Sequence, residues 1–347
     1  MKKIIYSVLT LALLVTSCSN DDDLATPSEP LGAYEDGIIV SSEGGPSSIS
    51  YVSNDFSTSE NQVYFNVNGE NLGVYLQSVG FHEDKAYIVV DAGTISVVNR
   101  YTFENLGTIS TGLSLPRYIA FNGDTAYVSD WADPNNATDD YIAVVDLNSN
   151  TVTASIAVSE GPEQVLVNSN KLYVSHKGGY NTNNVVTVVN TEDNTTETIT
   201  VDSKPDEMAI NNDGDLIVLS GGNESWTGNE TQASITKIDV SNNSIISSLA
   251  FETGLHPGLM SYNNGVAYYI VNNEVFGLTD DATTLPATPL FSVSAAYAYG
   301  LSIKDNNLFV TDASFTENST LLVYDILTGA ETNSFSVGIG ASKIYFN

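Results

Sequence analysis

The feature of this chain that most restricts its fold is a short motif that recurs seven times. In each copy a tight turn leads into an apolar triplet, and the copies are spaced by roughly 40 to 50 residues, the period of the four-stranded blades of β-propellers. The seven copies are Asp36-Gly37-Ile38, Lys85-Ala86-Tyr87, Thr125-Ala126-Tyr127, Lys171-Leu172-Tyr173, Asp215-Leu216-Ile217, Val266-Ala267-Tyr268 and Asn307-Leu308-Phe309. The chain is therefore predicted to consist of seven copies of one unit.

Each copy reads as a four-stranded antiparallel meander. A first strand precedes the motif, as at residues 164–167, and turn residues such as Asn168-Ser169 join it to the second. A third strand ends in Asp or Asn, as at 142–146, and an outer strand of alternating polarity follows, as at 152–158. One such sheet cannot bury both of its faces, whereas sheets arranged radially pack on their neighbours and leave few edges exposed.

The two ends of the repeat region predict how a ring would close. Tyr34 leads directly into a second strand, and residues 342–347 read as a first strand, so the two ends together would complete one blade. We therefore predict an all-β fold, a seven-bladed β-propeller of four-stranded antiparallel blades over residues 34–347. An open stack and rings of six or eight blades remain alternatives. The copy at 256–295 is the least regular, because two prolines obscure its outer strand.

The first 33 residues are predicted to be a targeting segment and a tether. Two lysines precede an apolar run at residues 4–15 that is too short to span a bilayer, and small residues then lead to Cys18. This pattern is similar to a bacterial lipobox, so residues 1–17 are predicted to be a lipoprotein signal peptide and Cys18 the lipidated residue. An ordinary signal peptide with a chance cysteine is the alternative. Residues 18–33 contain three consecutive aspartates at 21–23 as well as Pro27 and Pro30, which predicts an acidic flexible tether.

Charge and cysteine content exclude some classes of protein. Acidic residues outnumber basic ones 42 to 11, for a formal net charge of −31. Such a charge repels nucleic acid and anionic lipid, so we expect no nucleic-acid partner and membrane attachment only through the lipid. Cys18 is the only cysteine, which excludes a disulfide framework.

The turns that lead into the first strands should ring one mouth of the central channel. Four of these turns contain a proline, and the two residues after it differ between copies. In a propeller these turns share a face with the loops between second and third strands, where function should be sought. The candidates for the channel mouth are Arg117, Tyr118, Glu163, Gln164, Asp206 and Glu207, together with Tyr297 and Tyr299 from the last copy.

The loops after the second strand are longest in three consecutive copies. They begin at about Asp130, His176 and Gly221, and they carry both tryptophans of the protein, Trp131 and Trp226. Loops normally lack Trp, so ligand contact is predicted for these two together, although for each alone packing on the next blade is an equal alternative. Further candidates for ligand contact on this face are His176, Lys177, Tyr180, Asn183 and His256. For the histidines a structural role is the alternative.

Signatures of catalysis and of metal binding are missing from the sequence. It contains no Gly-x-Ser-x-Gly elbow, no phosphate-binding glycine loop and no HExxH or Cys/His spacing. We therefore expect no catalytic residues, no metal site and no cofactor. The alternative is a propeller lactonase or lyase with a calcium ion held by acids at the channel, drawn from Glu43, Asp130, Glu163, Asp206 and Asp312.

The repeat unit resembles the YncE-like, YVTN-type propellers. The segment 36–44 is also similar to the opening "GvlvlNEG" of propeller lipoproteins from Bacteroidetes, except that Ser42 replaces the Asn before Glu43. That group includes surface cobalamin-binding proteins that cap a TonB-dependent transporter. The resemblance implies a non-enzymatic lipoprotein on the outer face of the outer membrane, which binds a corrinoid and passes it to such a transporter. An adhesion or scaffold protein is a further alternative.

The resemblance implies roles for the candidate residues. Aromatic side chains would cover apolar ligand surface, and polar or basic side chains would supply hydrogen bonds or meet a phosphate. The aromatic set is Tyr118, Trp131, Tyr180 and Trp226, and the polar and basic set is Arg117, Gln164, Lys177 and Asn183. Tyr299 is a further predicted ligand-binding residue. His176 and His256 complete the predicted ligand-binding residues.

Overall fold

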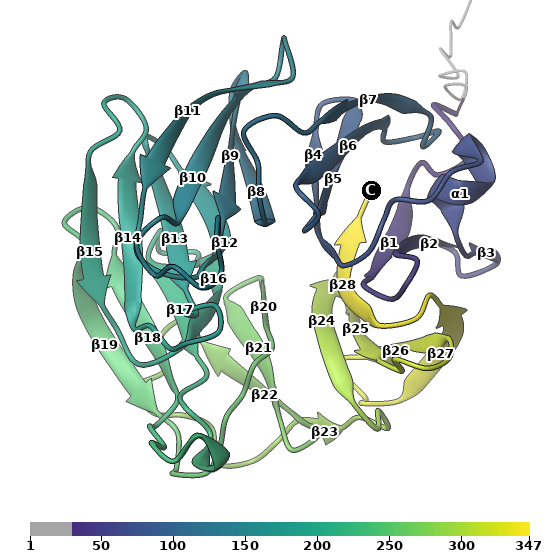
Figure 1. Ribbon diagram of the computed structural model, residues 1–347. Coiled ribbons are helices and arrows are strands. Elements are labelled where there is room, and N and C mark those ends of the chain that lie inside the picture. The colour runs from purple at the N-terminus through teal and green to yellow at the C-terminus, as the bar shows by residue number, and fades with distance from the viewer. Residues whose placement is uncertain (1–29) are drawn as a thin grey trace, which may run out of the picture. The chain divides into compact units, whose positions relative to one another are not determined.

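The computed structural model describes residues 30–347, so the predicted signal peptide, the lipidated Cys18 and most of the predicted tether lie outside the described residues. Residues 31–347 form one compact unit of seven four-stranded antiparallel sheets (Figure 1). The predicted all-β, seven-bladed propeller is confirmed. Within the described residues no helix is long and apolar enough to cross a membrane.

The first strand of each blade faces the central channel. Residues from all seven of these strands line one cavity along it. The first strands are β4 (Leu76–His82), β8 (Pro116–Asn122), β12 (Pro162–Asn168), β16 (Pro205–Ile210), β20 (Met260–Asn263), β24 (Ala298–Lys304) and β28 (Ala341–Phe346).

The second strands begin at or within the seven sequence motifs and are almost entirely buried, because each is covered on both faces by neighbouring blades. They are β1 (Gly37–Ser42), β5 (Lys85–Val90), β9 (Thr125–Asp130), β13 (Lys171–His176), β17 (Leu216–Ser220), β21 (Val266–Val271) and β25 (Asn307–Asp312).

The third strands end in a polar residue that shapes the next turn. The carboxylate of Asp146, for example, accepts the backbone N–H of Asn148, and Asp239 and Asp325 do the same at their turns. These hydrogen bonds lower the pKa of all three carboxyls. The third strands are β2 (Ser48–Ser53), β6 (Thr94–Asn99), β10 (Tyr141–Asp146), β14 (Val185–Asn190), β18 (Ser234–Asp239), β22 (Glu274–Thr279) and β26 (Ser319–Asp325).

The outer strands are the most exposed and the least regular. Two are reduced to two residues: one in the blade that contains Pro286 and Pro289, and one that is followed by the short helix α1 (Val63–Asn68). A second short helix, η1 (Ser225–Thr227), lies in the loop after β17. The outer strands are β3 (Ser59–Glu60), β7 (Asn105–Ile109), β11 (Thr151–Ala157), β15 (Thr196–Thr200), β19 (Ser244–Ala250), β23 (Phe291–Ser292) and β27 (Glu331–Val337).

The ring closes within one sheet whose strand order is β28-β1-β2-β3. The C-terminal strand β28 thus supplies the first strand of the blade that the N-terminal strand β1 begins, as predicted. The side chain of Asn347 adds to this closure: its Nδ2 donates to the carbonyl oxygens of Tyr34 and Arg100 at 2.6 and 2.7 Å.

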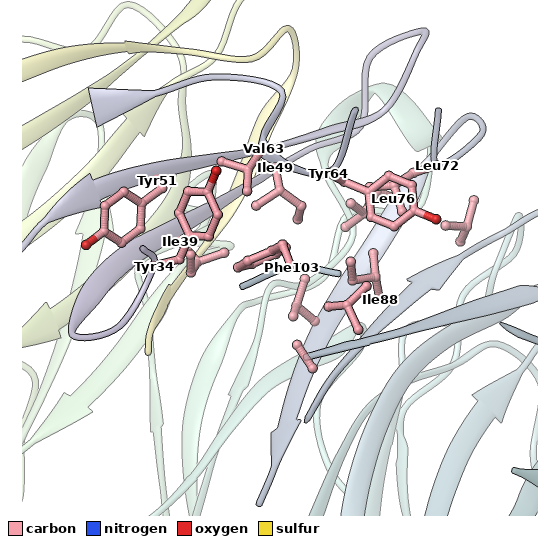
Figure 2. Close-up of a cluster of buried hydrophobic side chains, with 14 residues drawn as sticks. Tyr34, Ile39, Ile49, Tyr51, Val63, Tyr64, Leu72, Leu76, Ile88 and Phe103 are labelled. Atoms are coloured by element: carbon pink, nitrogen blue, oxygen red, sulfur yellow. The ribbon is translucent and has the colours of Figure 1, made fainter. Parts of the chain in front are cut away.

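Apolar side chains fill the spaces between blades. Figure 2 shows one such cluster, in which Ile39 and Ile49 of the closing blade meet Leu76 and Ile88 of the next, and Phe103 lies between them. Each fully buried side chain of this kind contributes about 1.5–3 kcal/mol relative to exposure, so the spaces between blades hold the ring together.

Candidate functional site

The same backbone irregularity in three consecutive blades turns pairs of side chains toward the channel. In β8 the pairing with β9 passes from Pro116 directly to Ile119, and β12 and β16 show the same shift after Pro162 and Pro205. Two residues then oppose one partner residue, which is a β-bulge, and a bulge re-aims the side chains that it contains. These pairs are Arg117 and Tyr118, Glu163 and Gln164, and Asp206 and Glu207.

The first member of each pair lies in the channel mouth, a cavity of about 470 Å³. Its lining includes Arg117, Glu163 and Asp206 from the bulges, and Tyr299 and Lys343 from β24 and β28. The volume is within the usual range for small-molecule sites, about 300–1,000 Å³. Below it, a second cavity of about 520 Å³ is lined by all seven first strands. Tyr118 and Lys343 line both cavities, so they lie at the level where the two meet.

Ion pairs connect neighbouring blades across the upper cavity. The guanidinium of Arg117 binds Glu163 through two N–O contacts, both 3.3 Å long, and lies 4.1 Å above the centre of the Trp131 ring. Burial raises the pKa of the Glu163 carboxyl, and the charge of Arg117 offsets part of that rise. Because Glu163 is only 4% exposed, its charge depends on this partner.

Two lysines form further ion pairs with acids of the bulges. Lys177 Nζ lies 2.6 Å from an Asp206 oxygen, and Lys343 Nζ lies 2.8 Å from a Glu207 oxygen. Burial alone would raise the pKa of Asp206, but Lys177 and Lys343 outweigh it and hold that pKa below its usual value. Gln164 donates to the same Glu207 carboxylate and accepts the backbone N–H of Met208. The charges of the channel are therefore held in place by interactions between blades.

Close backbone contact positions the turn that carries Glu163. Gly161 has a φ of +65°, and a Cβ atom there would lie 2.0 Å from the nitrogen of Gly179 in the neighbouring loop. Asp140, which is 3% exposed, accepts the N–H of Gly161 at 2.5 Å. Burial raises the pKa of this carboxyl to about 7. A glycine and a buried acid thus fix the loop on which Lys177 stands relative to the channel.

The structure corrects the expected position of His176. It is the last residue of β13 rather than part of a loop, and it is fully buried. Its ring bonds Thr187 Oγ1 at 2.8 Å and the carbonyl of Glu160 at 3.3 Å, and burial lowers its pKa to about 4. A neutral ring enclosed in this way holds the blade together, so we remove His176 from the candidate ligand contacts.

Asn183 is also bound within the protein. Its side-chain amide donates to the carbonyl of Glu160 at 2.8 Å, and its side-chain oxygen accepts the N–H of Asn184 at 2.9 Å. The second histidine candidate, His256, lines the mouth; its Nδ1 lies 2.9 Å from the carbonyl of Gly221 and its Nε2 3.6 Å from Glu230. The ligand roles predicted for Asn183 and His256 stay predictions.

The aromatic candidates in the loops lie on the same face as the mouth but differ in exposure. Trp131 is partly buried, because its N–H donates to the carbonyl of Pro162 in the next blade at 2.9 Å and Arg117 covers its ring. Tyr180 packs edge-on against Trp131 and is 75% exposed, and Trp226 is 81% exposed. All three follow a second strand, so the antiparallel topology places them on the face of the mouth.

Two residues of this face were missed by the sequence analysis. Lys343 lies at the meeting of the two cavities, with its ammonium 5.7 Å from the ring centre of Tyr118. Phe315, in the loop after β25, packs against Tyr297 and Tyr299 and is 56% exposed. The position of Lys343 in β28 matches that of Tyr118 in β8, so aligning the first strands of the copies was a signal that could have found it.

The acids of the calcium alternative are divided: Glu43, Glu163 and Asp206 line the mouth cavity, whereas Asp130 and Asp312 do not. Asp130 is fully buried and accepts the backbone N–H groups of Ser114 and Leu115, and Asp312 accepts that of Tyr297. Among residues 30–347, no group of three His, Cys, Asp or Glu side chains is arranged to hold a metal ion.

Comparison with known proteins shows the family to which this chain belongs. Residues 36–261, more than half of the chain, match the family model described as Domain of unknown function (DUF5074). The chain belongs to this family. No curated protein matches the sequence.

Solved structures share the fold of this DUF5074 protein at low sequence identity. They include a candidate 6-phosphogluconolactonase from Bacteroides fragilis NCTC 9343, with a TM-score of 0.64 and 14% identity over 91% of this chain and 98% of that one. Apo AztD from Citrobacter koseri has a TM-score of 0.56 and 10% identity over 89% and 97% of the two chains. The dihydro-heme d1 dehydrogenase NirN in complex with DHE has a TM-score of 0.58 and 12% identity over 92% and 77%. At these identities the likeness extends to the propeller fold.

Proposed function

We propose that this protein is a binding propeller that captures a small-molecule nutrient at the mouth of its channel. The observation that carries the proposal is the combination, on one face, of a polar cavity of about 470 Å³ and exposed aromatic side chains around it. Large exposed aromatic side chains grouped on one face mark interaction sites. Trp226 and Tyr180, at 81% and 75% exposure, would gain most from being covered.

The proposed ligand is a corrinoid. Its planar, amide-rich ring would lie across the mouth, where Trp226 and Tyr180 would cover apolar surface and Arg117 and Lys177 would meet amide or phosphate groups. This choice of ligand rests on the resemblance to cobalamin-binding propeller lipoproteins. In keeping with it, we propose that Cys18 carries the lipid, that the protein is held at the outer surface of the outer membrane, and that a TonB-dependent transporter receives the ligand.

The test is calorimetric titration of cyanocobalamin into the chain from Ser19 onward, with tryptophan fluorescence recorded in parallel. We expect saturable heat and quenching at micromolar protein. Trp226→Ala should weaken binding, because the indole is exposed in a loop on the same face as the mouth. The matched control is Leu327→Ala: Leu327 is equally exposed, at 78%, but lies in a turn between a third and a fourth strand on the opposite face. No heat and no quenching with the unaltered protein would rule out the corrinoid.

The ion pairs formed by the acids of the channel favour binding over catalysis. Glu163, Asp206 and Glu207 are each paired with a cation at 3.3 Å or less, which leaves them poorly placed to act as bases or metal ligands. The fold shared with the candidate 6-phosphogluconolactonase makes a lactonase the second function to test. Hydrolysis of 6-phosphogluconolactone that stops on addition of a chelator would establish it in place of simple capture.

A further inference from the structure

One wall of the channel mouth differs from the rest in having a carboxylate beside a cluster of aromatic rings. Tyr299 donates a hydrogen bond to Glu43 Oε2 at 3.3 Å. The Tyr297 ring stacks on Tyr299 at 5.5 Å between centroids, and Phe315 meets both rings edge-on at 6.1 and 5.5 Å. Glu43, Tyr297 and Tyr299 all line the mouth cavity. Tyr297 and Phe315 are more than half exposed, so the protein itself leaves much of this aromatic surface uncovered.

Glu43 is the acid of the mouth that lacks a basic partner. The other three carboxylates that line the cavity, Glu163, Asp206 and Glu224, each form an ion pair within 3.3 Å. Glu43 forms none with any residue of the described part of the chain, and its hydrogen-bond partners are the neutral hydroxyls of Tyr299 and Ser342. Its pKa is raised because burial disfavours the charge, although Arg117 and Lys343 lie close enough to lower it in part. Both of those cations are already bound by their own carboxylates.

A partly buried carboxylate without a counter-ion is stabilised by a cation that enters beside it. Aromatic faces attract cations as well, most strongly when the site is shielded from water, and clusters of such rings suit alkylated ammonium groups. The net charge of −31 favours the approach of a cation over that of an anion. We infer that the mouth contains a subsite for an alkylammonium cation, formed by the Glu43 carboxylate and the rings of Tyr297, Tyr299 and Phe315. This rests on the mouth being a ligand site, but not on the ligand being a corrinoid.

Two regions of the mouth would then bind chemically different parts of one ligand. On the wall of β1 and β24, the ligand would present a positive group with apolar substituents. On the wall of β8, β12 and β16, Arg117 of β8 would meet its polar or anionic part together with Lys177, which follows β13 and pairs with Asp206 of β16. A ligand that carries both kinds of group would span the mouth, which gives the protein a means of discriminating among nutrients of similar size.

The experiment uses choline as the probe and 3,3-dimethyl-1-butanol, its uncharged isostere, as the matched comparison. Both are titrated into the chain from Ser19 onward, and binding is followed by ligand-detected NMR and by competition. We expect choline to bind about tenfold more tightly than the alcohol, a difference of about 1.4 kcal/mol. Glu43→Gln should remove this preference, and Phe315→Ala should weaken choline binding. Tyr299→Phe, which keeps the ring, should retain most of it.

The control for net charge is Glu192→Gln. Glu192 is exposed in the turn between β14 and β15, on the face opposite the mouth, so this change alters the total charge without touching the subsite. Equal binding of choline and its isostere, or equal loss of choline binding in Glu43→Gln and Glu192→Gln, would overturn the inference, and so would absence of choline binding to the unaltered protein. Thermal unfolding of each variant shows whether it is folded. Because the probe is choline alone, the result is independent of whether cyanocobalamin binds.

Discussion

Replacing Arg117 by Met tests whether the paired charges of the channel are as interdependent as their burial implies. The side chains of Arg117 and Glu163 are 17% and 5% exposed and share two contacts of 3.3 Å. Removing one partner of a buried ion pair leaves the other charge uncompensated and costs about 3–5 kcal/mol. Because the contacts are long and Arg117 is not fully enclosed, we expect about 3 kcal/mol. Unfolding entropy of about 2.1 cal/mol/K per residue over roughly 300 residues converts this to a fall in Tm of about 5 °C.

The assay is calorimetric and urea unfolding at pH 7, compared with unfolding at pH 5. Burial already raises the pKa of Glu163, and loss of Arg117 should raise it further. The variant should therefore recover part of its stability at pH 5, where Glu163 can be protonated in the folded state. The double variant Arg117→Met with Glu163→Gln should recover most of it at pH 7, because no buried charge is left. A single variant as stable as the unaltered protein at pH 7, or a double variant less stable than the single one, would refute this reasoning.

Three further predictions concern other parts of the structure, and a fourth concerns Cys18, which the sequence predicts to be lipidated. Burial raises the pKa of Asp140 from 3.8 to about 7. Between these values the folded protein holds a proton that the unfolded chain releases, so its stability should fall as pH rises from about 4 to 7. Urea unfolding should show a shallower fall for Asp140→Asn. Gly161→Ala should lower Tm by several degrees, since its Cβ would collide with the backbone of the neighbouring loop. Trp226→Phe should remove the red-shifted, easily quenched part of the tryptophan emission, because Trp226 is exposed and Trp131 is largely covered; an unchanged spectrum would contradict these positions. Cys18→Ala should move the protein from the membrane fraction to the soluble fraction; unchanged fractionation would argue against lipidation.

The ring could be predicted from the sequence because its signal is repeated seven times. A turn followed by buried residues recurs wherever a second strand must fit between two neighbouring blades. One irregular copy, at 256–295, therefore did not change the predicted number of blades. The pairing of β28 with β1 followed from an unmatched strand at each end of the repeats. Helix α1 was not predicted, because six residues are too few to show a helical period.

The position of the mouth could be predicted, but not its chemistry. The prolines before Arg117, Glu163 and Asp206 marked the turns, yet which carboxylate meets which cation depends on distances across the ring that no local pattern records. Lys343 enters the network from the far end of the chain and pairs with Glu207, 136 residues away in sequence.

The loop position predicted for His176 is wrong. A histidine at the end of a strand was read as the start of a loop. The strand instead continues one residue further, and because β13 is covered on both faces, His176 is buried like the residues before it. Phe315 was overlooked for the opposite reason: its importance comes from contact with Tyr297 and Tyr299, which lie in a different strand and its preceding turn.

The central claim, capture of a ligand over the channel mouth, is tested most directly by hydrogen–deuterium exchange with and without saturating cyanocobalamin. The account predicts slower exchange in the loops at 131–140, 177–184, 221–233 and 313–318, which lie on one face, and no change in the turns at 147–150, 191–195 and 326–330 on the other. Protection confined to the second set of turns, or exchange unchanged everywhere, would contradict it.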